Sequence, residues 1–117
     1  MLPVKTYSIK VDGYGPHLYS ARTPAKAKAQ AWRAYRICHY ISFGDFLRKL
    51  HIYRVANPEG VGDRILVNDR PATRCVGRSD HYVWFMYDDS DVVLCSHPAD
   101  VTPIRPAGDG GATGREG

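Results

Sequence analysis

Hydrophobic and polar residues alternate at the start of the chain in the pattern of a β-hairpin. Residues 4–11 alternate and are rich in residue types that favour strands. Residues 12–16, Asp-Gly-Tyr-Gly-Pro, carry a strong turn signal, and residues 17–22 follow as a return strand. The pattern therefore predicts two antiparallel strands before the chain reaches Thr23.

The pattern then changes to one that predicts a helix over residues 25–39. Thr23 can cap its N-terminus, Pro24 suits the first helical position, and the segment is rich in alanine. Small inner residues would let this helix lie close to a sheet, while the opposite stripe is basic. The inner face carries Ala27, Ala31, Ala34, Tyr35 and Cys38 with Trp32 at its edge, and the stripe carries Lys26, Gln30 and Arg33 with Arg36 beside it.

A second, shorter helix is predicted over residues 43–50, with Ser42 as its N-cap. Residues 51–55 then form a third strand. The N-terminal part is therefore a ββααβ unit, with the helices on one side of a small sheet. The helix residues expected to pack inward, from their spacing, are Phe43, Phe46, Leu47 and Leu50.

Short strands separated by tight turns dominate the rest of the chain. A single 3₁₀ turn is predicted at residues 97–100, between the fourth and fifth of these strands. This order resembles an SH3-like barrel, and its spacing also fits a plain antiparallel meander. The predicted strands are residues 62–67, 72–76, 81–87, 92–95 and 101–104.

These elements predict an α+β protein in three parts. Residues 1–56 form a basic α+β unit, and Asn57-Pro-Glu-Gly60 marks the boundary. Residues 57–105 form a small SH3-like β subdomain. Five of the last twelve residues, 106–117, are glycine, which predicts a flexible tail.

The strand predicted at residues 81–87 is apolar on both faces. One face must fill the β subdomain, and it carries Val83, Phe85 and Tyr87. The other face either packs on the N-terminal unit, which we favour, or forms an exposed aromatic patch. If it is exposed, Tyr82 and Trp84 are the candidate contact residues, because large rigid aromatic side chains contribute much of the energy at interfaces.

Charge separates the two halves of the chain. Residues 1–55 hold ten Lys and Arg and two acidic residues, which gives this half a formal charge of +8. Residues 56–117 hold six Arg and ten acidic residues, which gives the second half a formal charge of −4. The basic half could attract nucleic acid or an acidic protein, and the two halves could also attract each other. The candidate partner-binding cations are Lys26, Arg33, Arg36, Arg48, Lys49 and Arg54.

Residues that could carry catalysis or bind a metal are present but poorly spaced. Cys95 and His97 could supply two ligands, with Cys75 or His81 on neighbouring strands, but no C-x-x-C or H-x-x-x-H spacing supports a zinc site. The acidic segment 88–91 lacks the glycine and the distal glutamate of a calcium loop. We therefore predict no catalytic residue, no metal site, no cofactor and no enzymatic activity.

The bulk composition predicts a cytoplasmic protein without a membrane segment. Hydrophobic residues make up 44% of the 117 positions, which allows a packed core. No apolar run approaches the roughly 20 residues needed to cross a bilayer, and no secretory signal pattern stands at the N-terminus. Three cysteines are too few for a disulfide framework, and an odd number of cysteines cannot all pair.

The order of elements over about residues 4–104 is similar to that of small proteins encoded by bacteriophages and prophages. The resemblance rests on Ser20-Ala-Arg-Thr-Pro-Ala-Lys-Ala-Lys opening a helix, on Ser42-Phe-Gly-Asp-Phe-Leu, and on the stretch from Gly62-Asp-Arg-Ile to His97-Pro-Ala-Asp-Val101. It implies a mobile-element accessory protein in the bacterial cytoplasm. Anti-CRISPR proteins, which occlude a binding surface of a host defence complex, are a prominent class among such proteins.

Three functions follow as expectations. The first is a non-enzymatic, anti-CRISPR-like inhibitor whose partner is a host protein or ribonucleoprotein complex that handles nucleic acid. The second is a basic module that contacts DNA or RNA directly through the N-terminal half. The third is a component of a phage particle or of its assembly.

Overall fold

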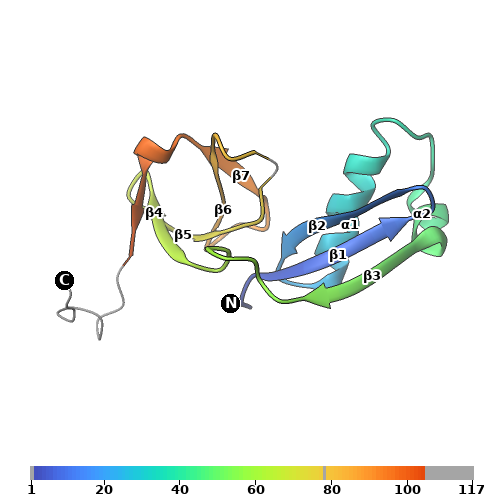
Figure 1. Cartoon of the computed structure of the whole chain (residues 1–117), viewed down its shortest axis with the longest axis horizontal. Coiled ribbons are helices and arrows are strands. Elements are labelled where there is room, and N and C mark those ends of the chain that lie inside the picture. Colours follow the sequence, from blue (N-terminus) through green and yellow to red (C-terminus); the bar gives the residue numbers. More distant parts are fainter. Residues whose placement is uncertain (1, 78, 105–117) are drawn as a thin grey trace.

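The computed structural model describes residues 2–77 and 79–104, so the tail predicted at residues 106–117 lies outside the described residues. These residues form two antiparallel sheets that lie side by side along an elongated molecule (Figure 1). The predicted α+β class is confirmed. A ββααβ unit comes first, and a five-stranded sheet curled into half a barrel follows.

The first sheet contains β1 (Lys5–Val11), β2 (Tyr14–Ala21) and β3 (Leu50–Val55) in the order β2-β1-β3. The turn between β1 and β2 is shorter than the predicted five residues. Val11 pairs with Tyr14, so only two residues connect the strands, and the register shifts between Ile9 and Val11. The strand continues through this irregularity because Gly15 adopts a φ of +93°, which glycine tolerates.

Helix α1 (Pro24–Tyr35) begins where it was predicted, since the Thr23 side chain accepts a hydrogen bond from the Lys26 main-chain N–H at 3.2 Å. It ends four residues earlier than predicted, and Cys38 is exposed rather than on the inner face. The alanine run stops at Ala34, and the aromatic and β-branched residues that follow have lower helix propensity.

Helix α2 (Phe43–Lys49) is also capped as predicted, because the Ser42 hydroxyl accepts from the Asp45 N–H at 3.1 Å. The predicted inner face is only partly correct. Phe46 is completely buried, but Phe43 and Leu47 are 38% and 39% exposed. A helix of only seven residues presents a narrow stripe to the sheet, so its flanking apolar residues stay at the edge.

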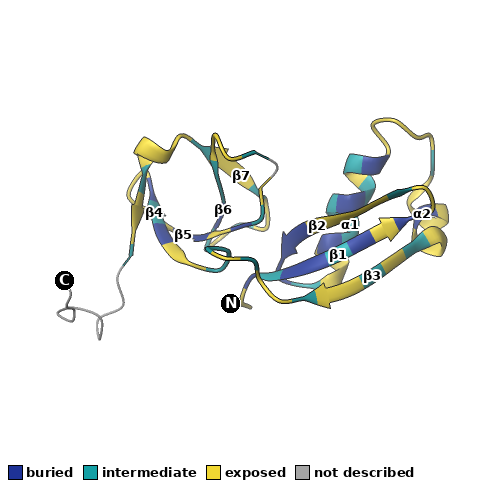
Figure 2. Ribbon diagram, in the orientation of Figure 1, coloured by how far each residue is buried: buried dark blue, intermediate teal, exposed yellow. Residues whose placement is uncertain are grey.

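Both helices pack on the same face of the first sheet (Figure 1). Alternate residues of the strands point into this core, and Figure 2 shows that β3, at the edge, is largely exposed. The opposite face of this sheet has no helix over it in the described part of the chain. The buried core consists of Tyr7, Ile9, Val11, Tyr19, Ala21, Ala27, Ala31, Tyr35 and Phe46.

The second sheet has the order β7-β6-β5-β4-β8. Its last strand returns to pair with its first after a 3₁₀ turn at Pro98–Asp100, which curls the sheet. Asn68 and Asp69 make a two-residue turn with positive φ angles, tighter than predicted. The strands are β4 (Arg64–Val67), β5 (Arg70–Arg74), β6 (Val83–Tyr87), β7 (Leu94–Ser96) and β8 (Val101–Pro103).

The concave side of the half-barrel holds a small core of its own. Its four buried residues are Ile65, Val67, Ala72 and Phe85. Val83 and Tyr87 pack against these residues. The face of β6 that was predicted to fill the β subdomain therefore lies in the half-barrel core. The other face of β6 is directed at the N-terminal unit and forms part of the junction between the two sheets.

Candidate binding groove between the two sheets

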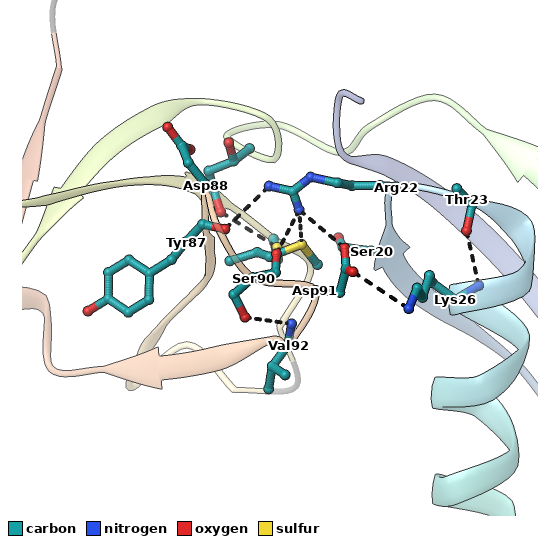
Figure 3. A network of polar contacts seen from close by, with 12 residues as sticks. Ser20, Arg22, Thr23, Lys26, Tyr87, Asp88, Ser90, Asp91 and Val92 are labelled. Carbon is teal, nitrogen blue, oxygen red and sulfur yellow. Dashed lines mark hydrogen bonds and ion pairs between the residues drawn. The ribbon is translucent and has the colours of Figure 1, made fainter. Parts of the chain in front are cut away.

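Arg22, directly after β2, anchors the junction between the sheets. Its side chain is only 7% exposed. Its guanidinium donates from Nη1 to the Ser90 carbonyl at 3.0 Å and from Nη2 to the Tyr87 carbonyl at 3.3 Å, and it also contacts the Met86 sulfur (Figure 3). Among the described residues, its Nε has no hydrogen-bond partner. A single arginine therefore links the end of one sheet to the loop after β6.

Asp91 carries the charge contacts across this junction. It lies 3.9 Å from Arg22 and 3.6 Å from Lys26 (Figure 3). The basic and acidic halves therefore meet through Asp91, as one of the two interpretations of the charge asymmetry expected. Lys26 was a candidate partner-binding cation, and the structure gives it a partner within the chain.

The other acids of this loop are also paired with arginines. Asp88 receives two hydrogen bonds from Arg64 at 2.6 and 2.7 Å, and Asp89 lies 3.3 Å from Arg70. Hydrogen bonds from Arg64 hold the pKa of Asp88 below its usual value. The three acidic side chains of this loop are therefore all paired with basic side chains from other parts of the same chain. Neither here nor elsewhere in the described residues do three or more His, Cys, Asp or Glu side chains gather as a metal would need.

Polar and apolar contacts close the junction further. The Val76 N–H donates to the Ser20 hydroxyl at 2.8 Å, and the Thr6 hydroxyl donates to the Asn57 side chain at 2.7 Å. A third hydrophobic cluster lies between the sheets and joins segments from both. Its buried members are Val4, Cys75 and Met86, with Trp84 and Val93 packed against them.

The second face of β6 divides between packing and exposure. Trp84 is partly buried, and its Nε1 donates to the Ser79 carbonyl at 3.2 Å. The Gly77 backbone lies against its indole so closely that an alanine Cβ there would come within 1.9 Å of a ring carbon. Tyr82, just before the strand, is half exposed. The Trp84 ring is therefore fixed in position, whereas the half-exposed Tyr82 side chain is available to contact a partner.

A groove follows the outer edge of β2 at this junction. It has two hollows, of about 1000 and 370 Å³, and Leu18, Val76 and Trp84 line both. We call these two hollows together the junction groove. Charges of both signs border it, with Arg74, Glu59 and Asp80 on the larger hollow and Arg33 and Asp91 on the smaller one. Its exposed apolar side chains are Leu18, Ile37, Tyr82 and Val92.

Three of the six candidate cations have contacts within the chain. Lys26 pairs with Asp91, Arg36 lies over the Trp32 ring at 4.6 Å, and Arg48 pairs with Asp45. The remaining three have no ion pair in the described part of the chain, and they are distributed over three elements. Arg33 is on α1, Lys49 on α2 and Arg54 on β3.

Sequence reasoning found Tyr82 and Trp84 but missed their neighbours at the groove. Leu18 was only one of several apolar residues in a predicted strand, and Arg22 carried no signal that separated it from other arginines.

Comparison of the chain with protein-family models, curated proteins and solved structures gave no match. Neither helix in the described residues has the length and apolar character to cross a membrane.

Burial at the junction predicts a protected thiol at Cys75. Desolvation raises the pKa of this thiol to about 12, and its Sγ donates to the Thr73 carbonyl at 3.6 Å. Because the thiolate is the reactive form, we expect iodoacetamide at pH 8 to alkylate the exposed Cys38 and Cys95 ~100-fold faster than Cys75.

Timed quenching and peptide mass spectrometry would measure these three rates. In denaturing urea the three cysteines should react at similar rates, which controls for local sequence. Equal rates for Cys75 and Cys95 in the native protein would contradict the packing at the junction.

Proposed function

We propose that this chain is a non-enzymatic binding protein that receives a protein partner in the junction groove. The observation that carries the proposal is the row of exposed apolar side chains, including Leu18 and Tyr82, beside a firmly held Trp84. Aromatic anchors next to a rigid wall are typical of the residues that dominate binding energy. The mixed charges around the groove suit a protein surface better than a run of phosphates.

The proposal extends to an anti-CRISPR-like inhibitor that occludes a binding surface of a host defence complex in the bacterial cytoplasm. The resemblance to phage-encoded accessory proteins supports this form. Arg22 and the apolar cluster at Met86 support it too, because they hold the two sheets in one orientation. A preorganised surface loses less entropy on binding than a flexible one.

Affinity purification from a bacterial lysate, with and without nuclease treatment, tests this function. We expect a defined complex that survives nuclease. The purified partner should then bind the Tyr82→Ala variant about tenfold or more weakly by calorimetry, because Tyr82 is an exposed aromatic side chain at the groove.

The matched control is Tyr40→Ala, which removes a fully exposed tyrosine from the connection between α1 and α2. This variant should bind like the wild type. Equal weakening by both substitutions, or recovery that disappears with nuclease, would overturn the proposed role of the groove.

A further inference from the structure

Away from the half-barrel, the face of the first sheet opposite the helices carries side chains that are exposed except for the partly buried Ser8. Tyr7, Ile9 and Val11 point into the helical core, so the alternate residues of β1 and their cross-strand partners lie on the other face. Ser8 pairs with Leu18 on one side and with Tyr53 on the other, and Lys10 pairs with His51. We call this set the open face: Ser8, Lys10, Leu18, His51 and Tyr53.

Only one end of this face is covered by the half-barrel. Thr6 and Ser20 are buried there, and they hydrogen-bond to Asn57 and Val76 of the second half. Beyond them the face is open, and Tyr53 is 67% exposed near the middle of the edge strand β3. A flat aromatic ring on a sheet, with no helix above it in the described residues, is a stacking surface.

The open face has one Lys, Arg, Asp or Glu residue, and it is the basic residue Lys10. The cations of α1 and α2 belong to the side that the helices cover, and Arg54 pairs with Tyr7, which points into the helical core. Lys10 lies on the open face itself and has no ion pair among the described residues. The acids that border the junction groove, Glu59, Asp80 and Asp91, line its two hollows and are not part of the open face.

We propose that the open face binds single-stranded nucleic acid, with Tyr53 stacking on a base and Lys10 contacting a phosphate. Adjacent rows of side chains on a strand stand about 7 Å apart, so the tyrosine and the lysine can engage neighbouring parts of one extended strand. In a duplex the bases are stacked on one another, so Tyr53 selects unpaired strands. Tyr53 and Lys10, which carry this inference, do not line the junction groove, although Leu18 belongs to both surfaces. The inference does not rest on the proposed function.

Fluorescence anisotropy with a labelled 12-nucleotide oligothymidylate tests the inference on the full chain at low salt. We expect Tyr53→Ala to weaken binding about tenfold, because it removes the stacked ring, and Tyr53→Phe to retain binding. Lys10→Ala should reduce the slope of log K against log salt by about 0.7, the value for one phosphate of a single strand. The control variants Tyr40→Ala and Tyr82→Ala should bind like the wild type.

Three further ligands separate this inference from its alternatives. An abasic oligomer of the same length carries the same phosphates without bases, and we expect it to bind more weakly. Equal binding of the abasic oligomer, of a duplex or of a polyglutamate peptide would overturn the inference, because each shows attraction by charge alone. Unchanged binding by Tyr53→Ala would overturn it as well.

Discussion

Replacing Phe46 with alanine is expected to lower the free energy of unfolding by about 3–5 kcal/mol. Phe46 is completely buried, and its ring lies 5.5 Å from that of Tyr35, between α2 and the sheet. No other residue of α2 is buried. A helix this short is not stable in isolation, so losing its one anchor both opens a cavity and releases the helix from the sheet.

Urea denaturation followed by far-UV circular dichroism would measure this loss. Phe43→Ala is the matched control, because Phe43 is 38% exposed at the edge of α2 and meets the Trp32 ring edge-on. It should cost about 1 kcal/mol, in proportion to the smaller apolar area it buries. Equal losses for the two variants would contradict the packing of α2 described above.

The parts of the fold that the sequence predicted are those decided by neighbours along the chain. Thr23 and Ser42 cap helices through hydrogen bonds to main-chain groups three residues later, so their residue type and position suffice. The strand alternation that placed Phe85 in the half-barrel is equally local. Such features survive into the structure because tertiary contacts reinforce them.

The candidate site could not be predicted in the same way, because it is built from contacts between distant segments. Arg22 meets carbonyls more than 60 residues away, and Leu18 borders the groove only because β2 lies at the edge of its sheet. Tyr82 and Trp84 were found as aromatic residues of one face. Their different exposure depends on Gly77 and Ser79, which position the indole.

Arg22 is the second residue at which a large effect is expected. Arg22→Ala should lower the free energy of unfolding by about 3 kcal/mol, because it removes a buried guanidinium that donates to the carbonyls of Ser90 and Tyr87. The loss falls on the junction rather than within either sheet. The half-barrel core has four buried residues, which is too few for independent stability, so we expect this part to unfold first.

Two probes can follow the two parts separately. In a Trp32→Phe background, Trp84 fluorescence reports on the half-barrel, while far-UV circular dichroism reports mainly on the helices. The transitions should coincide with Arg22 present and separate in Arg22→Ala, with fluorescence changing at lower urea.

The control is Arg48→Ala, which breaks an exposed ion pair with Asp45 within α2 and should leave both transitions nearly unchanged. Loss of Arg22 should also speed alkylation of Cys75, because the thiol is protected only while the sheets stay together. If Arg22→Ala leaves the transitions coincident and Cys75 protected, the apolar contacts of Val4 and Met86 hold the junction without the arginine. In that case the rigidity of the groove rests on hydrophobic packing alone.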